Sequence, residues 1–503
     1  MATATAKALS PTAREFVERG PKGLLIGAER VEAAEGRTFE TIDPATGDAV
    51  CEVALAGPED VTRAAAAARG ALEGSLRKVH PARRSSLMYS LAELIKASGE
   101  ELAELESLDN GKPLAAAKAD MAAAVNHLRY YAGWPTKIEG ETIPVSARDV
   151  LCYTLREPVG VCALIVPWNF PLLMAIWKVA PALAAGCPVI LKPAEQTPLT
   201  ALRLGELALE AGFPEGTLNV LTGDGGTGAA LVDSPGVDKV AFTGSTEVGR
   251  EIGAKCGRSL KRVTLELGGK SPNIVLPDAD LERAIKGSYQ GIYFNSGQAC
   301  NAGSRLFVQR DLFDEVTERL AAYAREAKVG PGLDPETEFG PLVSAEQLDR
   351  VRGYIDSGVQ EGAEVVVGGG PAEASGDGAG RSDGGGYFVA PTLFTGVEDS
   401  MRIAREEIFG PVLVAMPFED LEEVARRAND TEYGLAAGLW TRDVSKAHKL
   451  AALLQAGSVY VNNWGVGDPA APFGGYKASG IGRERGHANL DAYLETKTVF
   501  VQL

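Results

Sequence analysis

Apolar residues recur at helical spacing in the first third of the chain. Leu91 lies four positions after Leu87, and Leu94 and Ile95 lie three and four positions after Leu91; this spacing predicts a helix with one buried face. A second helix is predicted over residues 102–108, where leucines again recur every third position. This part of the chain should therefore be mainly helical.

Between Val159 and Glu266 the pattern changes to short apolar runs separated by helical segments, with Gly or Pro at each change. Strands that alternate with helices predict a mostly parallel sheet covered on both faces, the doubly wound arrangement that binds nucleotides. The strand candidates are residues 159–166, 189–191, 218–221, 240–242 and 262–265.

A second α/β region is predicted after Gly269. Residues 368–386 are rich in Gly, Ser and Asp, and we expect a flexible surface loop there. Residues 23–53 predict short strands at an N-terminal edge. The tail, residues 495–503, alternates apolar and polar groups and should end exposed, which suits pairing with another subunit. The strand candidates of the second region are residues 306–309, 364–367, 412–416 and 458–462.

Length, charge and cysteine usage narrow the class of protein. A chain of 503 residues is too long for one core, so two or three domains are expected. The net charge of −17 argues against nucleic acid or an anionic membrane as partner. The N-terminus has no signal-peptide core, and no apolar run is long enough to cross a membrane, so we expect a cytoplasmic protein. Six scattered cysteines and four separated histidines favour free thiols and no metal site.

Two segments carry candidate chemistry. Cys300 lies among small and amide-bearing residues in segment 294–305, which leaves room for a substrate beside its thiol. Glu266 lies in the strand-like segment 263–270, directly before a turn at two glycines. A nucleophile and a potential base, each beside a flexible turn, indicate covalent catalysis followed by hydrolysis.

These segments, together with residues 166–171 and 472–484, closely resemble the NAD(P)-dependent aldehyde dehydrogenase superfamily, in particular its hydrolytic, acid-forming branch. The resemblance runs from about Asn110 to the C-terminus. It implies an α/β fold with a Rossmann-type cofactor domain, an α/β catalytic domain and a small oligomerisation arm, and a homo-oligomer that is a dimer or a tetramer. The expected divisions are residues 1–134 and 151–265 for the cofactor domain, 266–472 for the catalytic domain, and 135–150 with 485–503 for oligomerisation.

Two segments could bind a nucleotide cofactor, and the sequence evidence for the second is stronger. Residues 223–228 fit the fingerprint G-x-G-x-x-G, but no acidic residue ends a following strand at the spacing that holds a ribose. Lys192 and Glu195 stand at the end of a predicted strand, where such a pair can hydrogen-bond ribose hydroxyls. The resemblance assigns both to the adenosine ribose. A carboxylate at Glu195 would repel a 2′-phosphate, so NAD is favoured over NADP.

The resemblance assigns further residues to the cofactor. Gly244 and Ser245, at a strand-to-helix turn whose N–H groups suit an anion, would contact the pyrophosphate. Glu407 would hold the nicotinamide ribose and Phe409 would pack near the ring. The remaining cofactor residues on this basis are Ile165, Val166, Pro167, Trp168, Gly225, Phe242, Val248 and Leu267.

The catalytic roles also follow from the resemblance. Cys300 would attack the aldehyde, and Asn169 with the cysteine's own N–H would stabilise the alkoxide of the thiohemiacetal. Transfer of hydride to NAD leaves a thioester, which water activated by Glu266 would hydrolyse. Lys178 and Glu484 match positions proposed to relay protons, although a surface ion pair would explain both equally well.

The substrate is the least specified part. Small residues at Ala123, Gly465 and Gly467 suggest a wide entrance for bulky or long aldehydes. Broad aliphatic or aromatic aldehydes are the first expectation. Betaine aldehyde and semialdehydes remain alternatives, as do a CoA-acylating relative, against which Glu266 counts, and a catalytically silent relative. By resemblance the apolar lining is Phe170, Leu173, Met174, Trp177 and Phe473, and each of these could instead be a core residue.

Overall fold

The structure is a computed structural model that describes residues 9–372 and 385–503. The N-terminal region has the predicted short strands, preceded by helix α1. The predicted helix with leucines at 87, 91 and 94 is α3; Leu87 and Leu91 are buried, as is Ile95. The elements are α1 (Pro11–Glu18), β1 (Leu24–Ile26), β2 (Glu29–Val31), β3 (Thr38–Ile42), β4 (Ala49–Ala54), α2 (Pro58–Glu73), α3 (Pro81–Ala97), α4 (Gly99–Asn110) and α5 (Leu114–Ala132).

The first large sheet has the strand order β19-β11-β10-β7-β8-β9-β1-β2, and its five central strands are parallel. Leu164 of β7 packs into one core cluster, whereas its neighbours Ala163 and Ile165 pack into another. Since successive side chains of a strand point to opposite faces, both faces of the sheet are covered, as predicted. The elements are β7 (Cys162–Ile165), α6 (Pro171–Ala185), β8 (Val189–Lys192), α7 (Leu199–Glu210), β9 (Leu218–Val220), α8 (Gly225–Asp233), β10 (Lys239–Thr243), α9 (Thr246–Ser259), β11 (Arg262–Glu266) and β19 (Gly480–Ile481).

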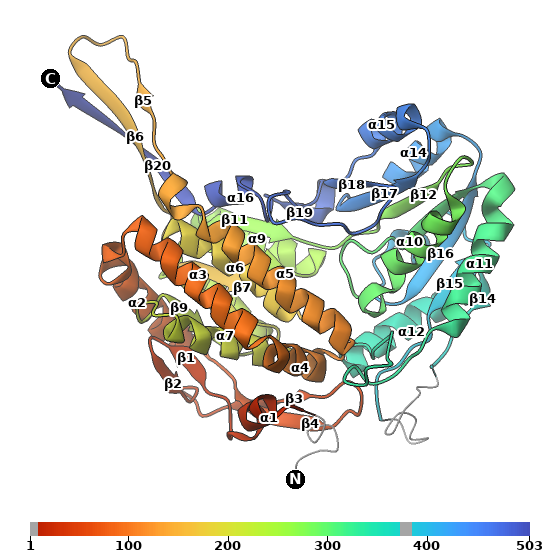
Figure 1. Cartoon of the computed structure of the whole chain (residues 1–503), viewed down its shortest axis with the longest axis horizontal. Coiled ribbons are helices and arrows are strands. Elements are labelled where there is room, and N and C mark those ends of the chain that lie inside the picture. Colours follow the sequence, from red (N-terminus) through yellow and green to blue (C-terminus); the bar gives the residue numbers. More distant parts are fainter. Residues whose placement is uncertain (1–8, 373–384) are drawn as a thin grey trace.

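The second sheet has the order β14-β15-β16-β13-β12-β17-β18 and forms the other lobe of the molecule (Figure 1). The four predicted strands of this region are present as β13, β14, β16 and β18, and β12, β15 and β17 lie among them without having been predicted. The elements are β12 (Pro272–Val275), α10 (Leu281–Tyr293), β13 (Arg305–Gln309), α11 (Phe313–Glu326), α12 (Ala345–Gln360), β14 (Glu364–Val367), β15 (Thr392–Thr395), α13 (Arg402–Arg405), β16 (Val412–Phe418), α14 (Leu421–Asn429), β17 (Ala436–Trp440), α15 (Val444–Leu453) and β18 (Ser458–Val461).

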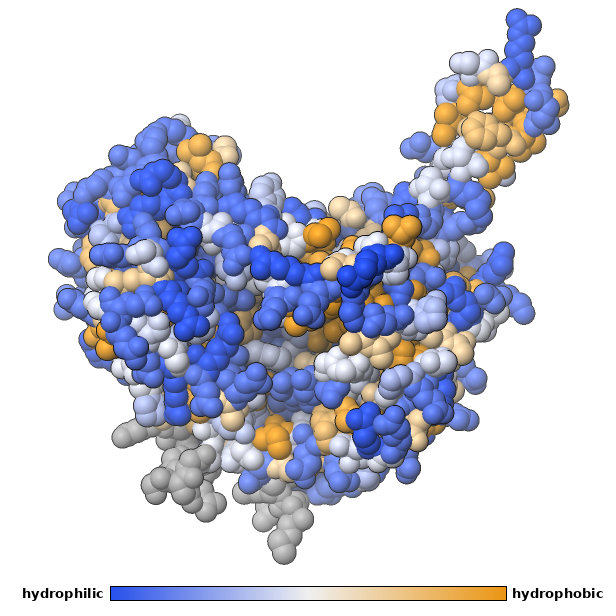
Figure 2. Space-filling view, turned by 180° about the vertical axis from the view of Figure 1, so that it is seen from behind, coloured by the Kyte–Doolittle hydropathy of each residue, from blue (hydrophilic) through white to orange (hydrophobic). Residues whose placement is uncertain are grey.

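A three-stranded arm projects from the body (Figure 1). It is formed by β5 (Thr142–Ile143), β6 (Val150–Pro158) and β20 (Leu494–Gln502), with β6 antiparallel to β20 along its whole length. Figure 2 shows apolar residues gathered on this arm. The tail alternates and is exposed, as predicted; exposed large apolar side chains on the arm are Leu151, Leu155, Phe500, Val501 and Leu503.

Part of the predicted loop at residues 368–386, namely residues 373–384, lies outside the described residues. In the described part of the chain, no helix is long and apolar enough to cross a membrane. The same residues contain no group of His, Cys, Asp or Glu that could hold a metal ion.

The C-terminal segment returns from the second lobe to the first sheet. β19 pairs antiparallel with β11, so that Gly480 lies opposite Glu266. Phe473 and Glu484 form an isolated antiparallel bridge in the same segment, with both N···O distances at 2.7 Å. This return brings residues from the end of the chain to the carboxyl end of β11.

Candidate active site

Cys300 follows a short 3-10 turn, Phe294–Gly297, and its thiol is part-buried. Asn295 and Ser296 in that turn have φ of 52° and 55°, in the left-handed region. Gln298 holds the loop through its side chain, which accepts from the Val343 backbone N–H at 3.0 Å. Burial raises the pKa of Cys300 to about 12, and the negative charges of Glu407 and Glu266 act in the same direction. The thiol therefore needs a positive group or a base beside it before it can attack.

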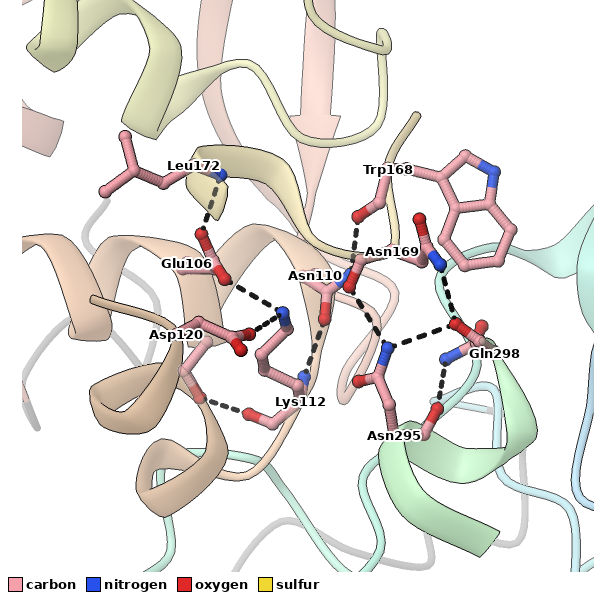
Figure 3. Close-up of polar contacts among 10 residues, drawn as sticks. Glu106, Asn110, Lys112, Asp120, Trp168, Asn169, Leu172, Asn295 and Gln298 are labelled. Carbon is pink, nitrogen blue, oxygen red and sulfur yellow. Dashed lines mark hydrogen bonds and ion pairs between the residues drawn. The ribbon is translucent and has the colours of Figure 1, made fainter. Parts of the chain in front are cut away.

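Asn169 lies in the loop between β7 and α6, where its side chain is buried. Its Nδ2 donates to the carbonyl of Gln298 at 2.9 Å, and Asn295 Nδ2 donates to the carbonyl of Asn169 at 3.1 Å (Figure 3). A primary amide has two N–H groups, so one hydrogen bond to Gln298 leaves the second N–H of Asn169 able to donate to another acceptor. The Asn169 loop and the cysteine loop thus hold each other in place.

A buried network behind this loop was not predicted. Asn110 Nδ2 donates to the Trp168 carbonyl at 2.8 Å, and Glu106 accepts from the Leu172 N–H at 3.1 Å in the first turn of α6 (Figure 3). Lys112 neutralises Glu106 at 2.8 Å. The loop that carries Asn169 is therefore anchored on both sides by residues of α4.

Glu266 is the last residue of β11, and only 3% of it is exposed. Neither of its carboxylate oxygens has a hydrogen-bond partner within the described residues. Its pKa is raised well above the usual range, first by burial and then by Glu484, while Lys178 acts in the opposite direction. A Cβ on Gly474 would come within 2.6 Å of Glu266 Oε1, so glycine leaves the room that this carboxylate occupies.

Lys178 and Glu484 form an ion pair with each other in the interior. The alternative that they are surface residues is wrong, because Lys178 on α6 is fully buried and Glu484 is 2% exposed. Lys178 Nζ also donates to Thr243 Oγ1 at 2.7 Å, at the end of β10. Since both charges act on Glu266, the pair belongs to the surroundings of the candidate base.

The predicted ribose pair stands at the end of β8. Lys192 is buried, Glu195 is part-exposed, and their charged atoms are 3.6 Å apart. Lys192 Nζ also donates to the Pro193 carbonyl at 2.9 Å, and burial lowers its pKa. Ile165 ends the neighbouring strand β7, and the Val166 N–H bonds to the Lys192 carbonyl at 3.1 Å. This arrangement fits recognition of vicinal hydroxyl groups.

The two candidate pyrophosphate helices differ at their first turns. At α8, which begins at Gly225, the Asp224 side chain accepts from the N–H groups of Gly226 and Thr227. At α9, Ser245 accepts from the Val248 N–H. A carboxylate already at the start of α8 disfavours a second anion there, so α9 is the better phosphate site. Phe242 and Leu267 pack closely against Gly244 and Gly249, where a Cβ would come within 2.4 Å and 2.3 Å of their side chains.

Glu407 and Phe409 lie against the cysteine loop. Glu407 Oε1 accepts from the Gly269 N–H at 2.9 Å, and burial raises its pKa to about 7. Phe409 has φ of 61° and meets the Trp168 ring edge-on at 5.1 Å. A Cβ on Gly297 would lie 2.1 Å from the Gly410 carbonyl, so the two segments are in contact. The structure thus brings Trp168 from the first lobe beside Phe409 from the second.

The predicted lining residues are partly in the core. Leu173, Met174, Trp177 and Phe473 are all less than 10% exposed and belong to one buried cluster. Trp177 and Phe473 meet at 5.4 Å, whereas Phe170 stacks on Phe294 at 6.0 Å.

The two glycines from which a wide entrance was predicted differ in their surroundings. A Cβ on Gly467 would lie 2.5 Å from Arg485 Nη1, so this guanidinium fills the space, whereas Gly465 has open space beside it. Arg485 and His127 were missed by sequence reasoning. Arg485 directly follows Glu484 in the chain, and this position was the one signal that could have found it.

Comparison with known proteins identifies the family. The model of the Aldehyde dehydrogenase family matches residues 31–499. DhaS of Bacillus subtilis, which carries an aldehyde dehydrogenase name, is 54% identical over 489 residues, 96% of each chain. A phenylacetaldehyde dehydrogenase of Pseudomonas fluorescens is 48% identical over 492 residues, again 96% of each chain.

Solved structures agree as well. The NAD+ complex of an aldehyde dehydrogenase from Bacillus cereus superposes with a TM-score of 0.95 at 50% identity and covers 98% of this chain and 99% of that one. The predicted family and α/β fold are confirmed, and this chain belongs to the aldehyde dehydrogenase family.

Proposed function

We propose that this enzyme oxidises an aldehyde to a carboxylic acid with NAD as oxidant, through a covalent intermediate on Cys300. The proposal is supported chiefly by three features: the part-buried Cys300, the Asn169 amide bonded to the Gln298 carbonyl of the cysteine loop, and the buried Glu266 carboxylate, which has no hydrogen-bond partner within the described residues. Glu266 is close enough for its charge to raise the pKa of the thiol. This set has a nucleophile, an oxyanion donor and a base.

The residues fit NAD as the cofactor. Lys192 and Glu195 would hold the adenosine ribose, Ser245 with the start of α9 would hold the pyrophosphate, and Glu407 the nicotinamide ribose. The part-exposed carboxylate of Glu195 favours NAD over NADP because it would repel a 2′-phosphate. The NAD+ complex of the Bacillus cereus relative supports the same choice. When bound, NAD accepts a hydride from the substrate carbon and supplies a positive charge near the thiol.

The chain's own residues then account for the remaining steps. The Cys300 thiolate forms a C–S bond to the aldehyde carbon, and the resulting alkoxide accepts hydrogen bonds from Asn169 Nδ2 and the Cys300 N–H. Loss of hydride from that carbon re-forms the C=O bond and leaves a thioester. Glu266 removes a proton from water, the oxygen attacks the thioester, and the C–S bond breaks to release the acid and the thiolate. The Glu484 carboxylate would accept the proton from Glu266, and the Lys178 ammonium, its ion-pair partner, would donate a proton onward.

The expected substrates are aliphatic or aromatic aldehydes. The apolar side chains of Trp177 and Phe473 support this class, as does the phenylacetaldehyde dehydrogenase name of one relative. Glu266 counts against a CoA-acylating enzyme, since such an enzyme needs no hydrolytic base. A semialdehyde- or betaine-aldehyde-specific enzyme remains the alternative.

We also propose that different domains of the chain have different functions. Residues 1–134 and 151–265 would bind the cofactor and residues 266–472 would form the catalytic domain. The arm around residues 135–150 and 485–503 would assemble a dimer or a tetramer. The exposed apolar side chains of β6 and β20 support an interface with a second copy.

The test is NADH formation by purified protein against a panel of aldehydes, with NAD or NADP and with or without CoA. We expect CoA-independent NADH formation that is lost in Cys300→Ala. Absence of turnover on every aldehyde despite NAD binding would contradict the proposal and favour a catalytically silent relative. Turnover that requires CoA would instead favour the acylating alternative.

A further inference from the structure

Arg485 is a buried cation that has no ion-pair partner among the described residues. Only 6% of the residue is exposed, and its Nε has no hydrogen-bond partner. Within residues 9–372 and 385–503, its guanidinium takes part in no hydrogen bond and no ion pair. Its backbone is in the left-handed region at φ 59°. Proteins rarely bury a charge without pairing it, so this group needs an explanation.

The neighbouring acidic groups are otherwise engaged. The Glu484 carboxylate is paired with Lys178. Asp468 is exposed, and its Oδ1 accepts from the Ala470 N–H at 2.8 Å. The charge of Arg485 also acts on Glu266, but neither carboxylate oxygen of Glu266 has a hydrogen-bond partner within the described residues. The hydroxyls of Tyr460 and Tyr131, which interact with Arg485 as well, are neutral at physiological pH. No residue of the described chain therefore serves as the partner of Arg485.

The guanidinium lies over the aromatic rings that line the candidate site. Its Cζ is 4.8 Å from the centre of the Trp177 ring and 5.0 Å from that of Phe473. Trp177 Nε1 is a second buried donor without an acceptor. His127, beside Trp177 at 5.4 Å, is neutral because burial lowers its pKa to about 4. Two unsatisfied donors, one of them positive, thus lie together.

Arg485 and Trp177 lie near the candidate catalytic residues and not on a separate surface. Phe473 bonds to Glu484, the residue before Arg485, and the charge of Arg485 acts on Glu266. Tyr460 is close enough to both Arg485 and Cys300 to interact electrostatically with each.

We propose that Arg485, with Trp177 Nε1, is a specificity-determining site that selects aldehydes carrying a carboxylate at the end remote from the aldehyde. A guanidinium binds a carboxylate through parallel N–H groups, and such a substrate would supply the missing counter-charge. The proposal rests on the aldehyde-oxidising function above. It argues against betaine aldehyde, because the aromatic faces that would receive a trimethylammonium group already hold a cation, which would repel it.

The test compares matched pairs of charged and neutral aldehydes: 4-oxobutanoate against butanal, and 4-formylbenzoate against 4-methylbenzaldehyde. Arg485→Gln should lower the ratio of kcat/KM for the charged over the neutral aldehyde by about tenfold or more, mainly through KM. Neutral aldehydes should remain substrates, and their kcat/KM should change less than that of their charged counterparts. Arg485→Lys, which keeps a cation, should retain part of the preference. Arg442→Gln removes an equal charge at an exposed position and should leave the ratio unchanged.

An unchanged ratio in Arg485→Gln, with neutral aldehydes still oxidised, would overturn the specificity proposal and leave the proposed function intact. If the wild-type enzyme oxidises none of the aldehydes, charged or neutral, the proposed function itself is wrong. Calorimetry that measures the binding of glutarate, a dicarboxylate without an aldehyde group, then tests the Arg485 site in the absence of turnover. Binding to the wild type that is lost in Arg485→Gln supports the site, and equal binding, or none, overturns it.

Discussion

Lys178 and Glu484 are 306 positions apart in the sequence, and their side chains form an ion pair in the interior, beside Glu266. The two charges act on Glu266 in opposite directions: Glu484 raises the pKa of its carboxyl and Lys178 lowers it. The pair therefore controls the pH at which the candidate base becomes able to accept a proton from water.

Glu484→Gln should move the acidic limb of the kcat–pH profile to lower pH. Removing the negative charge lowers the pKa of Glu266, and the rate of hydrolysis rises as Glu266 loses its proton. Lys178→Met should move the limb to higher pH for the opposite reason. It should also destabilise the fold by about 3–5 kcal/mol because it leaves a buried charge unpaired. If the kcat–pH profiles of the wild type and of both variants have the same midpoint, the ion pair does not control the pKa of Glu266.

Asn169→Ala should lower kcat by about 100- to 1000-fold, the usual effect of losing one oxyanion donor. NAD binding should be retained, because Asn169 is placed at the thiol and not on the ribose pair. Steady-state kinetics and a thermal melt separate lost chemistry from lost folding. Asn126→Ala, an exposed asparagine on α5, is the matched control and should have wild-type activity. A loss below tenfold in Asn169→Ala would argue against the oxyanion role.

Glu195→Gln should raise kcat/KM for NADP relative to NAD by about tenfold, equivalent to about 1.4 kcal/mol. The substitution removes the carboxylate that would repel a 2′-phosphate but keeps the shape of the side chain. Cofactor titrations at a fixed aldehyde concentration measure the ratio. Glu210→Gln, on the exposed end of α7, controls for loss of one negative charge. If the ratio is equal in the three proteins, Glu195 does not contact the ribose.

Substitution of the arm should weaken assembly without unfolding the body. Leu151 and Leu155 lie opposite Val501 and Lys497 on the same face of the arm and are about 40% exposed. Leu151→Glu with Leu155→Glu places two charges on that face, and Lys497 can pair with one of them. Light scattering should show a smaller particle than for the wild type, whereas Val444→Glu on α15 should assemble normally. An unchanged particle mass would show that this face is not the interface.

Much of the fold follows from local patterns in the sequence. The five parallel strands of the first sheet are short apolar runs between Gly and Pro, and they were predictable because parallel strands are buried on both faces. β12 and β17 were not predicted, since short apolar runs such as Pro272–Val275 resemble buried loop or helix segments. They are identified as strands only by their pairing, β12 with β13 and β17 with β18. Such pairing joins residues far apart in the sequence and cannot be read from a local pattern.

The site divides in the same way. Cys300, Glu266 and Asn169 lie in segments whose composition or motif can be recognised. The only signal for Arg485 is its position directly after Glu484, and an arginine next to a glutamate is more typical of a surface residue. Its burial depends on α6, which places Trp177 beneath the guanidinium. The contact that Asn110 makes with the site was not predicted either, because its hydrogen bond to the Trp168 carbonyl joins residues 58 positions apart.

The most direct test of the covalent hydrolytic mechanism is the reaction of Glu266→Gln with NAD and one aldehyde, followed by rapid mixing and intact-protein mass spectrometry. The variant should fold at least as stably as the wild type, because the buried carboxylate has no partner among the described residues. That gain should be absent below pH ~4.3 and grow as pH rises, since the folded-state pKa is raised. We predict a burst of one NADH per active site, an acyl group on Cys300 and almost no steady-state turnover. Steady-state turnover at the wild-type rate, with no acyl group on the protein, would contradict the roles of both Cys300 and Glu266.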